Sequence, residues 1–202
     1  MIKAIRLGVF CASLIPFAYL LYGALTNTLG PDPADTLAVS TGEWAFRFLL
    51  MSLAITPLRA LFKEPKLMPY RRTFGLFALF YASVHFLVYL VFLLQLRWSE
   101  ISEDILERPY ITVGFTAFVL LVALGATSNK FMMRRLGRRW KRLHSSVYLI
   151  NVLVLIHLLW ILRTDLAEAV FYGSILLPLL MYRLVKYLLA RRASQAKSLS
   201  RA

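Results

Sequence analysis

The sequence has little of several residue types on which common protein functions depend. Its 202 residues include one cysteine, Cys11, so the chain can form no internal disulfide and has no Cys-x-x-Cys-His motif for covalent haem attachment. It contains neither Gly-x-Gly-x-x-Gly nor Gly-x-x-x-x-Gly-Lys, which excludes a recognisable nucleotide-binding domain. Only 10 residues are acidic and only three are histidines. Any haem must therefore be bound without a covalent link.

Hydrophobic residues, in contrast, make up 59% of the chain. They form six apolar runs, each long enough to cross about 30 Å of hydrocarbon as a helix. We therefore predict an all-α membrane protein in which residues 1–190 form one domain and residues 191–202 a polar, disordered tail. Residues 27–41 are expected to form a loop and residues 97–109 a second outer loop with a short amphipathic turn of helix at the surface, and no internal repeat is evident. The predicted transmembrane helices cover residues 5–26, 42–62, 73–96, 110–127, 143–162 and 166–189.

The net charge of +14 is distributed unevenly along these six spans. Twenty of the 24 basic residues fall on one side of the predicted membrane, and nine of the 10 acidic residues fall near the other. The positive-inside rule then places both termini in the cytoplasm. The positive charge indicates contact with anionic lipid headgroups and no nucleic-acid partner.

The three histidines are the main candidates for chemistry, because an imidazole at membrane depth usually has a partner or a metal. Counted from the last cytoplasmic arginine, His85 lies about 20 Å into the third span and His157 about 22 Å into the fifth. The two are thus level in the outer half of the bilayer. Neutral imidazole is a common ligand of haem iron. We predict a b-type haem held between the third and fifth helices, with His85 and His157 as axial ligands.

His144 lies only about 3 Å into the fifth span, and in a straight helix its side chain would point some 140° away from that of His157. Either the helix carries a bulge or kink that brings the two histidines into register, or His144 has another role. The open readings are a ligand of a second, weakly held haem, a contact to a flavin or a haem propionate, and an interfacial histidine without a cofactor. We keep His144 as a candidate cofactor and metal ligand.

Three arginines are further candidates for cofactor binding. Arg47, Arg97 and Arg163 are expected near the outer interface, where they could neutralise haem propionates. Ordinary interfacial anchoring explains them equally well. Arg47 can also pair with Glu43, four residues before it on the same helix.

Several stretches resemble the MsrQ (YedZ) family, which belongs to the ferric-reductase-like transmembrane superfamily. They are TGEWAFRFLLMSLAITPLR, RRTFGLFALFYASVHFLVY, RPYITVG and LGRRWKRLHSSVYLINVLVLIH, and together they cover most of the chain. The family is the haem-binding membrane subunit of the MsrPQ protein-methionine-sulfoxide reductase system. His85, His144 and His157 each fall on a histidine of the family.

The resemblance implies a subunit of the bacterial inner membrane that passes electrons to the periplasmic molybdopterin enzyme MsrP, which repairs methionine sulfoxide in oxidised proteins. Larger members of the superfamily carry an inner histidine on the third span that this chain lacks, so a second bis-histidine haem stays open. They also carry a flavin and nicotinamide domain that is missing here. Electrons would therefore enter from quinone or a soluble flavin reductase, and the family is associated with FMN as well as haem.

Two other classes of function are open from the sequence. One is a b-type cytochrome that reduces another acceptor, such as quinone or a metal ion. The other is a non-redox membrane protein, either a transporter that relays protons through the histidines or an assembly subunit. Proton-coupled transporters usually need acidic groups within the spans. The chain has none near the predicted middle of the membrane, which favours the electron-transfer reading.

Overall fold

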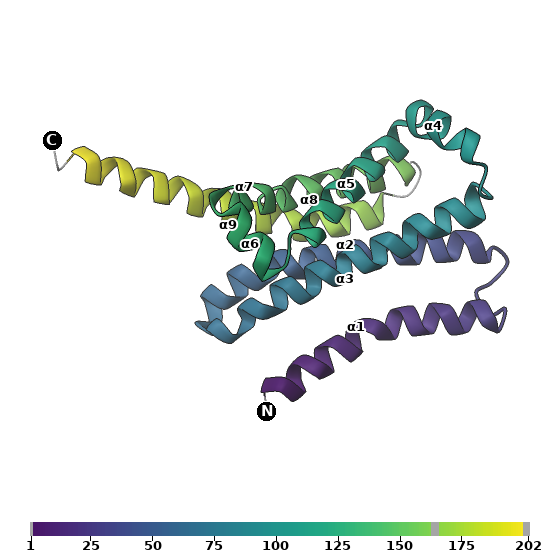
Figure 1. The fold of residues 1–202 in the computed structure, drawn as a ribbon, viewed down its shortest axis with the longest axis horizontal. Coiled ribbons are helices and arrows are strands. Elements are labelled where there is room, and N and C mark those ends of the chain that lie inside the picture. The colour runs from purple at the N-terminus through teal and green to yellow at the C-terminus, as the bar shows by residue number, and fades with distance from the viewer. Residues whose placement is uncertain (1, 163–165, 200–202) are drawn as a thin grey trace.

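The computed structural model describes residues 2–162 and 166–199, and every regular element in this part of the chain is helical. Six helical segments are long and apolar enough to cross a membrane, as the sequence predicts. The elements, shown in Figure 1, are α1 (Ile2–Leu25), α2 (Pro33–Phe62), the 3-10 turn η1 (Pro65–Leu67), α3 (Met68–Val88), the π-helical turn η2 (Tyr89–Leu93), α4 (Trp98–Glu107), α5 (Pro109–Ala126), α6 (Lys130–Leu136), α7 (Arg138–His144), α8 (Val147–Ile161) and α9 (Ala167–Leu199).

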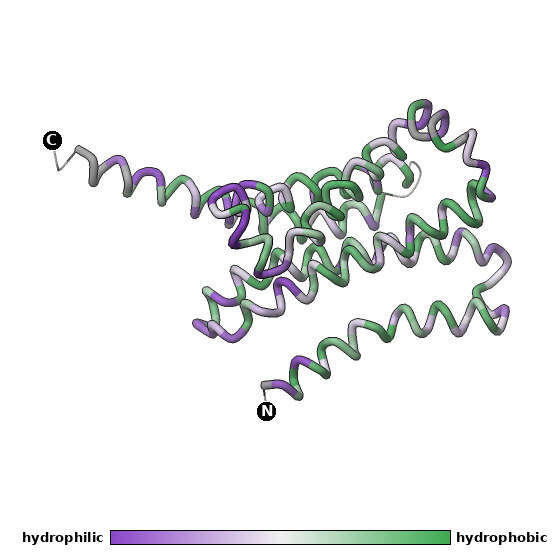
Figure 2. The backbone as a smooth tube through the Cα atoms, viewed as in Figure 1, coloured by the Kyte–Doolittle hydropathy of each residue, from purple (hydrophilic) through white to green (hydrophobic). Residues whose placement is uncertain are grey.

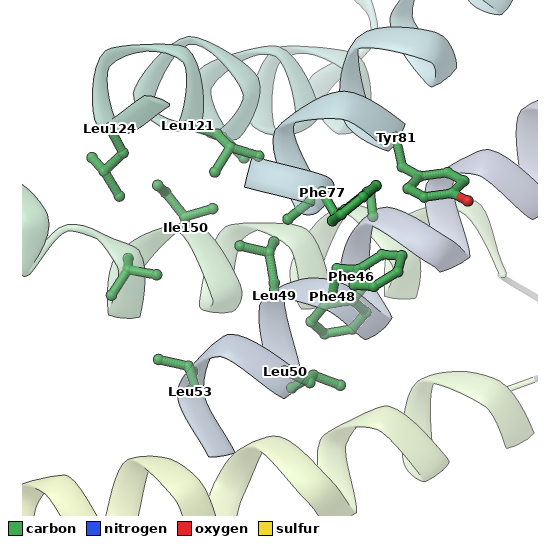
Figure 3. Packing of buried hydrophobic residues seen from close by; sticks show 14 of the residues in the cluster. Phe46, Phe48, Leu49, Leu50, Leu53, Phe77, Tyr81, Leu121, Leu124 and Ile150 are labelled. Atoms are coloured by element: carbon green, nitrogen blue, oxygen red, sulfur yellow. The ribbon is translucent and has the colours of Figure 1, made fainter. Parts of the chain in front are cut away.

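Two antiparallel helix pairs form the centre of the bundle. α2 packs along α3, α5 packs along α8, and α3 and α5 join the two pairs. The core between them is built from large apolar side chains, among them Phe46, Leu49, Tyr81 and Ile150, which are almost completely buried (Figure 3). Many other leucines and aromatic residues are exposed, as expected for helices whose outer faces contact lipid.

The bundle has a basic end and an acidic end. The basic end consists of residues 63–72 and 130–142, and both termini lie on this side of the molecule (Figure 1). The acidic end consists of residues 27–35 and 98–108, where α4 forms the predicted short surface helix. Figure 2 shows polar residues at the two ends and apolar residues along the spans between them. This arrangement agrees with the segregation of charge predicted from the sequence.

Two predictions about local structure are wrong. Residues 33–41 are helical rather than a loop, because Asp32 caps α2 by accepting a hydrogen bond from the Asp35 backbone N–H at 3.0 Å and Pro33 occupies the first turn. The polar tail is also helical, since α9 extends to Leu199. Its arginines and alanines favour helix even without burial.

α1 bends around its middle, where it contains Pro16 (Figure 1). Proline has no N–H, so the backbone hydrogen bonding of a helix is weakened around it. The Tyr81 hydroxyl of α3 inserts there: it donates to the Ser13 carbonyl at 2.8 Å and accepts from the Phe17 N–H at 3.0 Å. Tyr81 is fully buried, so these two bonds fix α1 against α3 one helical turn before His85.

Replacing Tyr81 by phenylalanine should therefore destabilise the bundle. The Tyr81→Phe variant leaves the Ser13 carbonyl and the Phe17 N–H without this partner, which should lower the free energy of unfolding by about 1–3 kcal/mol. Thermal unfolding in detergent would measure this. Tyr19→Phe is the matched control, because Tyr19 lies on α1 and is exposed. Equal melting temperatures for the two variants would show that the Tyr81 hydroxyl does not anchor α1.

Candidate functional site

His85 lies in the last turn of α3, close to the acidic end. Its Nδ1 atom is 2.8 Å from the Ala38 carbonyl oxygen of α2. A carbonyl can only accept, so Nδ1 carries the proton and donates this hydrogen bond. The Nε2 atom then has a free lone pair, which is the tautomer required of a histidine that binds a metal through Nε2.

His157 on α8 repeats this arrangement. Its Nδ1 atom is 2.7 Å from the Tyr110 carbonyl oxygen of α5, so it also donates to the backbone of a neighbouring helix. In both cases 47 residues separate the histidine from its acceptor, and the second pair follows the first at an offset of 72 residues. The helix pairs α2–α3 and α5–α8 thus form a structural repeat, which the sequence analysis failed to detect.

A glycine beside each imidazole makes this close packing possible. A Cβ atom on Gly42 of α2 would lie 3.1 Å from Nδ1 of His85, and one on Gly114 of α5 would lie 2.7 Å from Nδ1 of His157. Each glycine is four residues after the carbonyl that holds the same ring, and therefore on the same face of its helix. The two glycines also follow the 72-residue offset, so the glycine, carbonyl and histidine form one repeated unit.

The two imidazole rings lie close to each other between α3 and α8. Their centres are 6.4 Å apart and their planes are at 84°. A bond from a metal to an imidazole nitrogen is about 2.1 Å long and the ring centre lies about 1.2 Å beyond the nitrogen, so two ligands in line through one metal would have centres about 6.5 Å apart. The observed spacing and the tautomer fixed at each ring therefore fit a single metal ion with two axial histidines.

The metal of such a site would need further ligands from a cofactor. Within the described residues, no three or more His, Cys, Asp or Glu side chains gather into a metal-binding group. A haem supplies four nitrogen ligands itself and requires only the two axial ones from the protein. The residues present are thus suited to a haem iron and unsuited to a metal held by protein side chains alone.

Comparison with known proteins identifies the family. The sequence model described as "Ferric reductase like transmembrane component" matches residues 41–156, which include His85, His144, all of α3 and α5 and most of α2 and α8. A 44% identical relative from Xanthomonas euvesicatoria pv. vesicatoria (strain 85-10) aligns over 94% of this chain and 90% of its own length. It is named protein-methionine-sulfoxide reductase heme-binding subunit MsrQ. The chain belongs to the MsrQ family.

Other members of the MsrQ family support this assignment. The protein of the same name from Xanthomonas campestris pv. campestris (strain 8004) is 47% identical over 86% of this chain and 79% of its own length. The one from Bordetella pertussis (strain Tohama I) is 43% identical over 92% of this chain and 91% of its own length. Six apolar helices and a transmembrane family together make the chain a multi-pass membrane protein.

His144 occupies a different environment in this MsrQ family member. Its Nε2 atom is 3.1 Å from the Thr127 hydroxyl, which itself donates to the Ala123 carbonyl at 2.7 Å. Its ring stacks on Trp140 with centres 4.0 Å apart. The Trp140 indole donates to the Thr127 backbone carbonyl at 2.9 Å, so that Thr127, Trp140 and His144 contact one another. His144 is thus held by protein groups at the basic end.

The fifth span is interrupted between His144 and His157, where the sequence left open a bulge or kink that brings the two side chains into register. α7 ends at His144 and α8 begins at Val147. In the turn between them, the Ser146 N–H bonds to the carbonyl three residues back instead of four, at 3.0 Å. This tightened turn changes the helical register. It does not place the His144 ring with the other two, whose contacts all lie near the acidic end.

The three candidate arginines have different positions. Arg47 forms a 2.7 Å ion pair with Glu43, which confirms the predicted pairing, and donates to the Tyr172 hydroxyl at 2.9 Å. Arg97 precedes α4 and donates to the Leu94 carbonyl at 3.3 Å. Arg163 lies outside the described residues. A role of any of the three toward a propionate stays a prediction.

Sequence reasoning also missed two buried polar groups. Asn151 on α8 is fully buried and donates to the Val147 carbonyl at 2.7 Å, while its Oδ1 atom has no partner among the described residues. On α9, the guanidinium of Arg183 stacks over Tyr148 at 5.7 Å, and its buried Nη2 atom also has no partner in that part of the chain. A polar residue inside a predicted span was the available signal for both.

Proposed function

We propose that the chain is a b-type cytochrome subunit that relays electrons across the bacterial inner membrane. The observation that carries the proposal is the pair of imidazoles with centres 6.4 Å apart, each fixed through Nδ1 by a carbonyl of the adjacent helix. Family membership supports it, because the relatives are named heme-binding subunits. The chain's own part is to bind and orient the cofactor and to exclude water from it.

His85 and His157 would hold the haem through their Nε2 atoms. When bound, the haem supplies a one-electron carrier whose potential depends on its axial ligands, their hydrogen bonds and burial. The hydrogen bonds to Ala38 and Tyr110 increase the basicity of both imidazoles and fix their orientation. Both side chains are partly buried in the bundle. The role proposed for these residues is therefore to hold an electron carrier and to set its potential.

The relay is proposed to run from the basic end to the acidic end. Charge segregation supports cytoplasmic termini, with the acidic end in the periplasm. The two histidines lie close to this acidic end, which supports electron exit on that side. Following the family resemblance, the acceptor is MsrP, which repairs methionine sulfoxide, and the donor is quinone or a soluble flavin reductase at the cytoplasmic side.

A second cofactor, either a haem or FMN, is proposed for the basic end near His144. The guanidinium of Arg183 lies over the ring of Tyr148, four residues after His144, and its buried Nη2 atom has no partner among the described residues. Such a cationic group favours an anionic substituent, such as a propionate or a flavin phosphate. His144 would contact this cofactor from its place between Thr127 and Trp140.

The purified protein tests the proposal directly. We expect a low-spin b-type absorption spectrum that shifts on reduction with dithionite, together with a haem-to-protein ratio of about one or two. A colourless, folded preparation from haem-replete cells would refute electron transfer. The direction of electron transfer would be tested in sealed, oriented vesicles, where MsrP should oxidise the reduced haem only when it is added to the side of the acidic end. Oxidation only from the basic side would overturn the topology.

A further inference from the structure

A pocket of ≈380 Å³ lies between α2 and α9 at the basic end of the bundle. Three cationic residues line it: Arg59 of α2, Lys63 directly after α2, and Lys186 of α9. None of the described residues in its lining is acidic. Glu64, the acid nearest in sequence, is paired with Lys66 at 3.9 Å. Three positive charges around one small volume repel each other, so the pocket is suited to an anion.

Thr56 adds a hydrogen-bond donor to this pocket. Its hydroxyl is buried and has no partner among the described residues. By comparison, the hydroxyls of Thr41, Thr116 and Thr127 each donate to the carbonyl one helical turn before them, at 2.6–2.8 Å. A buried hydroxyl without a partner is unfavourable by about 1–3 kcal/mol. An oxyanion in the pocket would accept this hydrogen bond as well as those of the cations.

An apolar pocket of ≈500 Å³ adjoins the basic one between the same two helices. Leu58 and Leu61 of α2 and Leu179 and Tyr182 of α9 are part of its lining, and Ala60 lines both pockets. The Lys186 ammonium lies 6.0 Å from the centre of the Tyr182 ring, at the junction between the two. A cationic pocket at the end of two spans therefore continues into an apolar pocket that extends toward the middle of the membrane.

We propose that these two pockets bind one anionic glycerophospholipid. Its phosphate would contact Arg59, Lys63, Lys186 and the Thr56 hydroxyl, and an acyl chain would occupy the apolar pocket. A soluble anion would leave the apolar pocket unused, and a zwitterionic lipid would bring its own positive charge close to three others. Basic pockets between transmembrane helices are known to suit anionic headgroups. The lipid would link α9 to α2 at the basic end.

Lipid binding to the full chain, purified with its cofactor and stripped of lipid, tests the proposal. Native mass spectrometry would count dioleoyl phosphatidylglycerol and dioleoyl phosphatidylcholine bound from mixed micelles. We expect one saturable phosphatidylglycerol per chain and weaker binding of phosphatidylcholine. The triple variant R59Q/K63Q/K186Q should bind phosphatidylglycerol about a hundredfold more weakly, since each cation near the membrane surface contributes about 1 kcal/mol.

Matched variants distinguish lipid binding at this site from general attraction of lipid by surface charge. R138Q/R139Q/K141Q removes the same charge from α7, outside the pocket, and should leave the affinity unchanged. Thr56→Val should weaken binding about tenfold through loss of one hydrogen bond to a charged group, whereas Thr116→Val should not. Ala60→Trp should block the site by filling both pockets without changing the charge.

Three results would overturn the proposal. Equal weakening by the two triple variants would show general electrostatic attraction only. Displacement of phosphatidylglycerol by millimolar inorganic phosphate would assign the basic pocket to a free anion. Binding of phosphatidylglycerol without saturation, unaffected by Ala60→Trp, would show an annular lipid shell only.

Discussion

The His85→Ala and His157→Ala variants should each lose the low-spin haem spectrum that we expect of the intact protein. Either change removes one of two axial ligands and leaves an iron with an open position. No other described histidine can replace the lost one, because the third is held by Thr127 and stacked on Trp140. We expect more than about 90% of the low-spin signal to disappear, because even the loss of a group that only hydrogen-bonds a metal ligand typically weakens metal binding about 10–100-fold.

His144→Ala is the matched control, because it removes an imidazole from the same span without touching His85 or His157. It should retain the low-spin signal of the outer haem and slow reduction from the basic end if His144 contacts a second cofactor. Absorption and electron paramagnetic resonance spectra of detergent-purified variants would measure both effects. A wild-type spectrum in both His85→Ala and His157→Ala would show that the proposed pairing is wrong.

The closeness of His85 and His157 could be predicted from the sequence, while their role as axial haem ligands stays a prediction. Residue counting from the basic boundary places both at about the same depth, and the rise per residue of a helix is nearly constant. The rings do lie close to each other, with centres 6.4 Å apart. The six spans were equally predictable, because the length of an apolar run is set by bilayer thickness.

The immediate surroundings of the histidines could not be predicted. Ala38 contributes only its carbonyl oxygen, and any residue type supplies one, so the sequence carries no signal for it. Tyr110 holds His157 in the same way, through its backbone carbonyl and not through its side chain. The partners of His144 also depend on a kink whose geometry is set by tertiary packing. These features follow from the relative position of helices, which hydropathy does not specify.

Gly42 and Gly114 connect a feature of the sequence with the geometry of the site. In a sequence, a glycine within a span indicates only that helices can approach closely. In the structure, each glycine lies beside an imidazole and four residues after the carbonyl that holds it. The spacing of glycine, carbonyl and histidine repeats after 72 residues, so the haem site is proposed to be the meeting point of two equivalent helix pairs.

Gly114→Ala should therefore disrupt the site from the neighbouring helix, without changing a ligand. The added Cβ would lie 2.7 Å from Nδ1 and Cε1 of His157, whereas unstrained non-bonded contacts are about 3.5–4.0 Å. The ring must move by about 1 Å, which breaks its hydrogen bond to Tyr110 and displaces Nε2. Overpacking of this kind is unfavourable by about 1–3 kcal/mol, so we expect haem to be retained about 10–100-fold less well.

The other glycines provide a graded series of controls. A Cβ on Gly42 would lie 3.1 Å from Nδ1 of His85, so a shift of a few tenths of an ångström suffices and Gly42→Ala should have the smaller effect. Gly8 on α1 has no heavy atom within 4 Å of its added Cβ, so Gly8→Ala should only stabilise the helix, by about 1 kcal/mol or less. Haem-to-protein ratio, the low-spin signal and thermal unfolding would be measured for all three. If Gly114→Ala loses haem but unfolds at the same temperature as Gly8→Ala, the defect lies at the His157 ring. If Gly114→Ala retains haem fully, His157 does not bind haem in the observed orientation.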